Sequence, residues 1–244
     1  MALTVSSLKK GGRLFLMGAG TSGRLGVLEA AECPPTFNTP ASLIQAFMAG
    51  GNQSVFKSKE GAEDRGADAR AIIRSKTKKG DVVIGISASG VTAFAYHALQ
   101  TGKAKGLRTI LITCNKKVPK LPFVDQVIAL DTGAEVIAGS TRLKAGTATK
   151  LALNMITVGT MVRLGKVFGN RMVDLQPRSR KLEARATKLI RDLSQVSERE
   201  AERYLKASKG NAKTAILMAR KKISFSEAKR RLKQADGFLE AALR

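Results

Sequence analysis

Hydroxyl groups and glycines gather at two places in this sequence. Residues 18–24 read Gly-Ala-Gly-Thr-Ser-Gly-Arg, and residues 87–92 read Ser-Ala-Ser-Gly-Val-Thr. Backbone amides at the start of a helix hold anions, and glycine lets the backbone come close to them. Serine and threonine hydroxyls add further donors, so both segments indicate phosphate-binding loops. The candidate contacts are Thr21, Ser22, Gly23, Ser87, Ser89, Gly90 and Thr92.

These segments could also belong to a dinucleotide site or to ordinary turns. Gly-x-Gly-x-x-Gly is the dinucleotide fingerprint, which expects an acidic residue about 20 positions further on. Here the second apolar run ends in Phe-Met-Ala-Gly-Gly at residues 47–51, so that ribose contact is missing. Serine, threonine and glycine are also common in turns for local backbone reasons. Two such loops in one open parallel sheet nevertheless favour a ligand at its carboxyl edge.

A third polar segment, residues 139–147, opens a long apolar stretch. Ser140 or Thr141 could cap the helix that follows. Lys144 could instead point at a substrate. The residues alone leave both possibilities open, and Ser140 and Lys144 are kept as candidate binding residues.

Two carboxylates stand near these loops in the sequence. Glu32 ends an apolar, alanine-rich stretch just before Cys-Pro-Pro, and Glu63 lies at the start of an expected helix. At that position the negative charge of Glu63 would interact favourably with the positive end of the helix dipole. Nothing in their spacing pairs the two residues.

Short β-rich runs alternate with helical patterns from Gly12 onward, which is typical of a parallel α/β sheet. A proline pair at residues 34–35 should end the first of these helices, and residues 1–10 receive no assignment. The expected strands are 13–17, 42–48, 81–86, 108–113 and 126–130. The expected helices are 24–32, 53–57, 62–75, 92–103 and 143–164.

Strands are not expected after Gly169, where charged, alanine-rich patterns predict helices only. Ser197 and Ser224 each precede a glutamate at capping-box spacing. These helices should form a linking helix and a small three-helix module. Their expected ranges are 178–193, 197–207, 212–221 and 224–234.

Composition limits the function classes. The formal charge is +24, yet aromatic residues are 5% of the chain and do not interleave with the basic runs, so nucleic-acid binding is not expected. Two cysteines and one histidine cannot build a disulfide framework or a Cys/His metal cluster. No apolar run approaches the roughly 20 residues of a membrane span, and no signal peptide is recognisable. A cytoplasmic location is expected.

Five motifs in order resemble the N-acetylmuramic acid 6-phosphate etherases. They are residues 18–26, 31–36, 60–64, 144–147 and 165–170. The resemblance extends to the vertebrate glucokinase regulatory proteins. It implies an α/β fold with a sugar isomerase (SIS) type open parallel sheet flanked by helices, a flavodoxin-like three-layer sandwich. The implied domains are 1–170 for sugar phosphate, 171–195 as a linking helix and 196–244 as a UBA-like module.

The activity implied by this resemblance is cleavage of the D-lactyl ether of N-acetylmuramic acid 6-phosphate. Glu32 matches the family's proton donor and Glu63 its second catalytic glutamate, one ionised and one protonated. Ser22, Ser87, Ser89 and Thr92 match phosphate contacts. No metal or organic cofactor is implied, and the partners are an amino sugar phosphate and a second copy of the chain.

One alternative stays open. The second loop reads Ser-Gly-Val-Thr-Ala-Phe where the family usually has Ser-Gly-Arg-Thr-Pro-Tyr, and the segment before the first strand is short. Both departures favour a catalytically impaired sugar-phosphate-binding regulator. Retention of Glu32 and Glu63 favours the enzyme.

Overall fold

A five-stranded parallel sheet forms the centre of the first half of the chain. The computed structural model describes residues 1–175, 177 and 179–244. Its strands are β1 (Leu14–Gly18), β2 (Ile44–Met48), β3 (Val82–Ile86), β4 (Arg108–Thr113) and β5 (Gln126–Ala129). They lie in the order β2-β1-β3-β4-β5, so the chain reverses direction across the sheet between β1 and β3. The predicted α/β class and open parallel sheet are confirmed.

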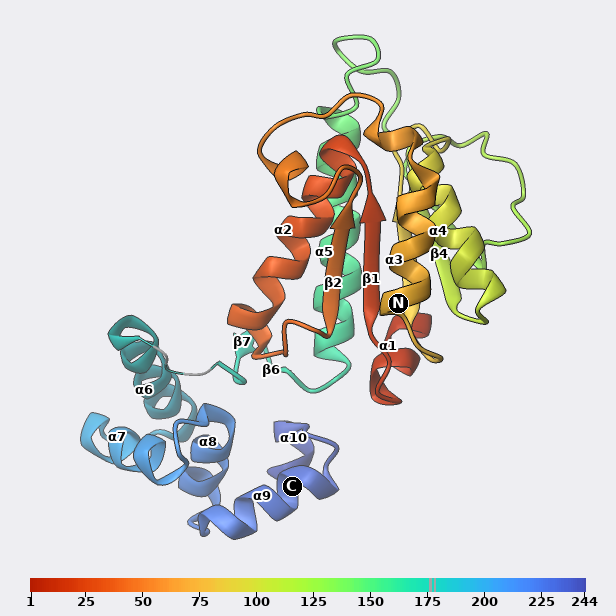
Figure 1. Cartoon of the computed structure of the whole chain (residues 1–244). Coiled ribbons are helices and arrows are strands. Elements are labelled where there is room, and N and C mark those ends of the chain that lie inside the picture. Colours follow the sequence, from red (N-terminus) through yellow and green to blue (C-terminus); the bar gives the residue numbers. More distant parts are fainter. Residues whose placement is uncertain (176, 178) are drawn as a thin grey trace. The chain divides into compact units, whose positions relative to one another are not determined.

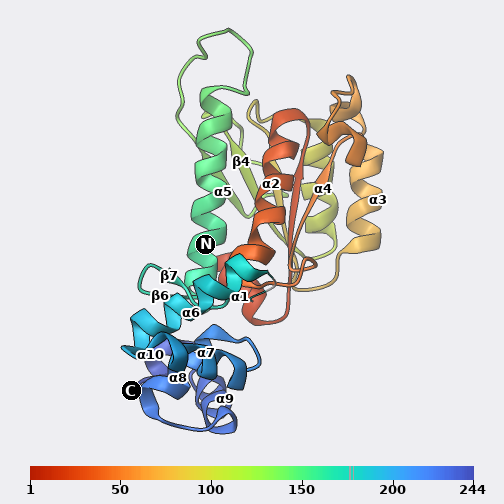
Figure 2. The ribbon, with the colours of Figure 1, turned by 90° about the vertical axis from the view of Figure 1, so that its left-hand side faces the viewer.

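Helices cover both faces of this sheet (Figures 1 and 2). α3 (Gly66–Lys76) and α4 (Ala93–Ala104) pack together on one face, where Phe15 and Met17 enter their core cluster. On the other face lie α2 (Gly20–Phe37) and α5 (Lys144–Val162). α2 approaches closely because Gly26 has no side chain, and a Cβ there would lie 3.3 Å from Leu16 Cβ.

A buried carboxylate joins the two helices of that second face. Glu29 of α2 is 3% exposed and accepts hydrogen bonds from Lys150 at 2.7 Å and from Asn154 at 3.1 Å, both on α5. Thr157 donates a third. A buried charge is tolerated only when it is paired and hydrogen-bonded in this way.

Three elements differ from the sequence-based expectation in this half. α2 does not end at Cys33 but continues through Pro34 and Pro35 to Phe37. The prolines lie near its end, where they remove only the bonds to the carbonyls of residues 30 and 31. The helix expected from residue 62 is divided into a 3-10 turn, Ala62–Asp64, and α3. An unexpected short helix, α1 (Ala2–Lys9), precedes the sheet.

The second half is helical, with a short hairpin at its start. Its helices are α6 (Arg180–Ser194), α7 (Glu198–Ala207), α8 (Ala212–Lys221), α9 (Phe225–Gln234) and α10 (Leu239–Ala242). β6 (Val167–Phe168) pairs with β7 (Arg171–Met172), which corrects the expectation that strands stop at Gly169. Gly169 takes a positive φ of 56° in the tight turn between them. The expected start of α6 at residue 178 lies outside the described residues.

The predicted capping box is complete at Ser197, whereas at Ser224 only one of its two hydrogen bonds forms. Ser197 and Glu200 form a complete capping box, and the hydrogen bonds from Ser197 lower the pKa of Glu200. Ser224 accepts from the backbone of Glu227, but the Glu227 carboxylate pairs with Arg230 and Arg231 instead of returning to the cap. α10 adds a fourth helix to the three expected.

A buried lysine braces the helical half. Lys213 Nζ lies 2.9 Å from Asp174 Oδ1 and donates to the carbonyls of Gly165 at 2.8 Å and Gly237 at 3.0 Å. Asp174 also pairs with Lys166 at 2.9 Å. Burial lowers the pKa of Lys213, and the charge of Asp174 opposes that shift. One ammonium group therefore ties together three segments of this half.

Candidate active site

Two phosphate-loop segments meet at the carboxyl edge of the sheet. Gly18 at the end of β1 lies beside Ile86 at the end of β3, which is where the strand order reverses and where open parallel sheets bind ligands. α2 starts at Gly20 and α4 starts after Thr92, so both helix N-termini lie at this edge. Their exposed amides and dipoles favour an anion there.

A cavity of about 360 Å³ lies between these segments. We call it the hydroxyl-lined cavity. Its walls carry four of the predicted contacts, and it also takes in Glu63. The lining residues are Ala19, Gly20, Thr21, Ser22, Glu63, Asp64, Ala88, Ser89, Val91, Thr92 and Thr141.

Ser87 and Gly90 lie behind the wall of this cavity. Ser87 is 1% exposed, and its Oγ accepts from the backbone of Gly90 at 3.1 Å and lies 2.8 Å from Thr92 Oγ1. Gly90 has a φ of 75°, and a Cβ there would meet Val118 at 2.5 Å. Both residues shape the loop that presents Ser89 and Thr92.

Gly23 contributes close packing of the first loop. It is buried, and a Cβ at this position would lie 2.7 Å from the carbonyl oxygen of Gly18. Its amide donates to the carbonyl of Ala19 at 3.1 Å. Any side chain here would push the helix start away from the strand and open the loop.

The third segment is capped by a residue that sequence reasoning missed. The carboxylate of Glu135 accepts from the backbone N–H groups of Lys144 and Ala145, both at 2.9 Å. Neither Ser140 nor Thr141 caps α5, and the cap arrives from nine residues upstream instead of the adjacent position. Thr141 lines the hydroxyl-lined cavity, whereas Ser140 and Lys144 are absent from its described lining.

The two glutamates lie far apart in the structure. Glu63 lines the cavity, in the 3-10 turn that follows the loop after β2. Glu32 lies twelve residues after Gly20 on α2 and is exposed. At 1.5 Å per residue this is about 18 Å from the carboxyl edge. The structure does not bring Glu32 and Glu63 together within one chain.

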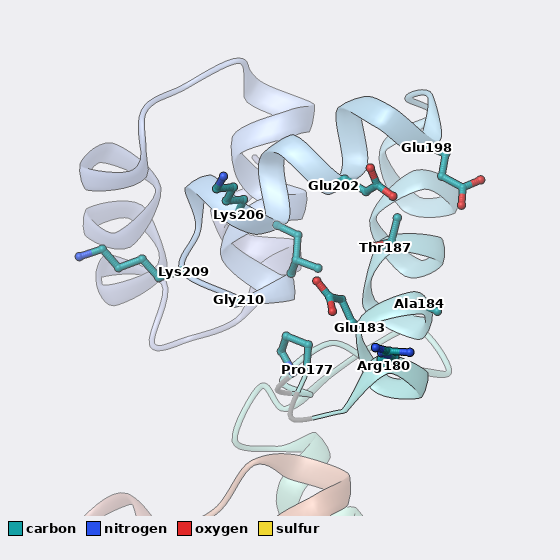
Figure 3. Close-up of a pocket in the computed structure, with 11 residues that line it drawn as sticks. Pro177, Arg180, Glu183, Ala184, Thr187, Glu198, Glu202, Lys206, Lys209 and Gly210 are labelled. Atoms are coloured by element: carbon teal, nitrogen blue, oxygen red, sulfur yellow. The ribbon is translucent and has the colours of Figure 1, made fainter.

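A larger cavity lies in the helical half, where α6 and α7 meet (Figure 3). It measures about 760 Å³ and is lined by Glu183, Glu198 and Glu202 together with Arg180, Lys206 and Lys209. Among its described lining residues, Thr187 carries the one hydroxyl, and none belongs to the phosphate-binding loops. We therefore place the candidate site at the sheet edge.

Neither cavity holds a metal-binding group. Within residues 1–175, 177 and 179–244, no three His, Cys, Asp or Glu side chains are grouped closely enough to hold a metal ion. In the same part of the chain, no helix is long and apolar enough to cross a membrane.

The hydroxyl-lined cavity offers hydroxyls, helix N-termini and a carboxylate, which suits an anionic, hydroxylated ligand.

A parallel sheet with such loops at its reversal point is the arrangement expected of a SIS-type sugar-phosphate-binding protein. The family models agree: residues 1–103 match the glucokinase regulatory protein N-terminal SIS domain, and residues 65–159 match the SIS domain. The Vibrio vulnificus NanR protein complexed with ManNAc-6P overlaps 66% of this chain and 53% of its own, at 16% identity and a TM-score of 0.45. An overlap this weak says nothing about function.

Similar proteins identify the family within this class. The N-acetylmuramic acid 6-phosphate etherase of Geobacillus thermodenitrificans is 48% identical over 99% of this chain and 82% of its own length. That of Synechocystis is 49% identical over 97% of this chain and 78% of its own. The chain belongs to the N-acetylmuramic acid 6-phosphate etherase family, and the predicted resemblance is confirmed.

Proposed function

We propose that this chain is a carbon–oxygen lyase that cleaves the D-lactyl ether of N-acetylmuramic acid 6-phosphate. The products are N-acetylglucosamine 6-phosphate and D-lactate. Etherases about 48% identical over nearly the whole chain support this function. The observation that carries it is that Glu63 lines one cavity together with Thr21, Ser22, Ser89 and Thr92.

The proposed chemistry follows from this position. The phosphate lies against the hydroxyls and the two helix N-termini, which fixes the sugar at the sheet edge. In the open-chain sugar the C1 aldehyde acidifies the C2 proton, which a carboxylate can remove. An acid protonates the departing lactate oxygen at C3, and water then adds to the unsaturated intermediate at C3. These steps require no metal or organic cofactor.

Glu63 and Glu32 take different places in this proposal. Glu63 acts on substrate bound to its own chain. Glu32 lies about 18 Å away along α2, so it can reach a bound substrate only from a second copy of the chain. In that arrangement each site combines Glu63 of one chain with Glu32 of the other.

An exposed apolar surface supports the proposed homodimer. Leu151, Met155 and Val158 form a row on α5, with exposed fractions of 54%, 65% and 42%, and Leu28 of α2 is 43% exposed. Leu28 lies one helical turn before Glu32. Contiguous exposed apolar side chains mark interaction surfaces. A second copy that covers this surface would also cover the part of α2 that carries Glu32.

Residues 1–170 form the sugar-phosphate domain, and residues 171–195 link it to a helical module of residues 196–244. The linking helix α6 shares one hydrophobic core with that module. We also propose that the protein acts in the cytoplasm. Aromatic residues remain too few for a nucleic-acid partner to be proposed.

The experiment is to incubate the purified chain with N-acetylmuramic acid 6-phosphate and assay D-lactate. Glu63→Gln should lower kcat by roughly 10²- to 10⁴-fold, because a positioned acid or base contributes that much. Binding of N-acetylglucosamine 6-phosphate, measured by calorimetry, should change little. Glu202→Gln, the same change on an exposed residue of α7, is the matched control. If the wild-type protein and the variants were equally inert but still bound sugar phosphate, the regulator alternative would hold instead.

A further inference from the structure

A smaller cavity adjoins the hydroxyl-lined cavity. We call it the side cavity; it measures about 190 Å³ and shares Ala19, Gly20 and Glu63 with its neighbour. Glu63 therefore stands at the junction of two cavities. A ligand whose reacting carbons lie at Glu63 would extend one group into each.

The walls of the side cavity have two characters. One part is apolar, from Met48, Ala49 and Ala62. The other part carries cations and hydroxyls, from Arg24, Ser54, Ser58 and Lys59. Glu60 lies in the same lining and offsets part of the positive charge. Such a site fits a small group that has both a methyl and an anionic end.

Arg24 is held in place within this wall. Its Nε donates to the carbonyl of Val55 at 2.8 Å and its Nη2 to the carbonyl of Ser54 at 2.9 Å. These bonds attach the loop of residues 52–58 to α2. The guanidinium charge is thereby fixed beside the cavity before any ligand arrives, which lowers the cost of ordering on binding.

Ser54 supplies a second, independent observation. The residue is 2% exposed, and its Oγ has no hydrogen-bond partner among the described residues. An unsatisfied buried hydroxyl is unfavourable, and a ligand oxygen that accepts its proton would relieve that cost. Of the residues that line the side cavity, Ser54 is the one with a buried side-chain oxygen that lacks a hydrogen-bond partner in the described part of the chain.

We propose that the side cavity binds the lactyl substituent of the substrate and so determines specificity for the ether over the free sugar phosphate. Lys59 and Arg24 attract the lactyl carboxylate, Ser54 donates to it, and Met48 and Ala49 receive the methyl group. This inference rests on the proposed function. With the C6 phosphate in the hydroxyl-lined cavity and the C3 substituent in the side cavity, C2 and C3 lie at Glu63.

The test compares two ligands that differ by the lactyl group alone. Calorimetry would measure N-acetylmuramic acid 6-phosphate and N-acetylglucosamine 6-phosphate on Glu63→Gln protein, which prevents turnover. Lys59→Met is then added, with Lys57→Met as the control, because Lys57 is exposed on the same loop but does not line the cavity. Lys59→Met should weaken the lactyl-bearing ligand about tenfold and the other ligand less than twofold. Lys59→Arg should restore most of the loss.

Ser54→Ala gives a second measurement that does not depend on charge. It should leave the thermal unfolding temperature unchanged or slightly higher, since it removes an unsatisfied hydroxyl, and should weaken only the lactyl-bearing ligand. Equal weakening of both ligands by Lys59→Met, or no weakening of either, overturns the proposal. If the wild-type protein still releases D-lactate in either case, the proposed function survives without the side cavity. If neither ligand binds any form of the protein, the proposed function itself fails.

Discussion

In the second loop, residues 87–92, a buried serine and an exposed serine have different roles. Ser89 faces the hydroxyl-lined cavity, whereas the Oγ of Ser87 is used inside the loop by the amides of Gly90 and Thr92. A side chain that satisfies buried amides supports the loop itself. A side chain in the cavity wall can instead meet a phosphate oxygen.

Alanine at these two positions should therefore give opposite results. Ser87→Ala leaves the part-buried amide of Thr92 without its acceptor, while the amide of Gly90 keeps the Ser87 carbonyl at 3.0 Å. The variant should therefore lower the free energy of unfolding by about 1–3 kcal/mol. Ser89→Ala should leave stability within about 0.5 kcal/mol of wild type but weaken N-acetylglucosamine 6-phosphate roughly tenfold. Urea unfolding and calorimetry measure the two effects. Lost affinity in Ser87→Ala at unchanged stability would mean that Ser87 touches the phosphate directly.

Among the elements, α4 and β4 are joined by one carboxylate. Asp125 precedes β5 and accepts from the backbone of Thr109 at 2.8 Å, and it pairs with Lys103 of α4 and Arg108 of β4. Partial burial acts to raise the pKa of Asp125, but the bonds from Lys103 and Thr109 outweigh it and lower the pKa overall.

This lowered pKa predicts acid sensitivity. Because the pKa of Asp125 is lower in the folded protein, its contribution to stability is present above the pKa of the unfolded chain, about 3.9, and is lost as the pH falls through the folded pKa. Asp125→Asn should be less stable than wild type by about 1 kcal/mol at pH 7, a value kept small because its cation partners are exposed. Below the folded pKa of Asp125 the two proteins should converge in stability. Urea unfolding across this range tests it, and a difference that persists in acid would assign the effect to packing.

Strand β3, the cap of α5 and the end of α2 differ in how far the sequence predicts them. The run at residues 82–86 is apolar and largely β-branched, so its strand was predicted within one residue, because burial on both faces leaves a local signature. The cap of α5 by Glu135 has no such signature, since it joins residues across an irregular segment. The prolines of α2 misled because their effect depends on where in the helix they lie.

The sequence already contained a reason to expect Glu32 and Glu63 to lie apart, although the family motifs suggested one shared site. A helix that starts at the carboxyl edge carries its later residues toward the opposite edge, so Glu32 had to lie far from the phosphate loops. Resemblance assigned both glutamates to one reaction without saying that one chain must hold both. The side cavity, by contrast, depends on how residues 48–63 fold back over α2, which no local pattern encodes.

For the whole molecule, the exposed apolar row on α5 predicts association. Met155→Glu places a charge at the centre of this row and should convert dimers to monomers in size-exclusion chromatography. Val136→Glu is the matched control, because Val136 is 86% exposed on a loop away from the row. Unchanged elution of both variants would remove the row as the interface.

Mixing two inactive variants tests whether the site is shared. If Glu32 acts from the second chain, Glu32→Gln and Glu63→Gln proteins that exchange subunits form mixed dimers with one intact site each. Random mixing should then recover roughly a quarter of wild-type activity, as expected for a symmetric dimer with two equivalent sites. Both glutamates acting within one chain would give no recovery.

The bracing of the helical half by Lys213 has a practical consequence for following its folding. The Lys213 side chain is only 7% exposed, and Asp174 and two carbonyls engage its ammonium group, so amine-reactive reagents reach it only after this half opens. Most other lysines of this basic chain lie at the surface and react at once. The rate of labelling at Lys213 would therefore report the rate at which the C-terminal helices open.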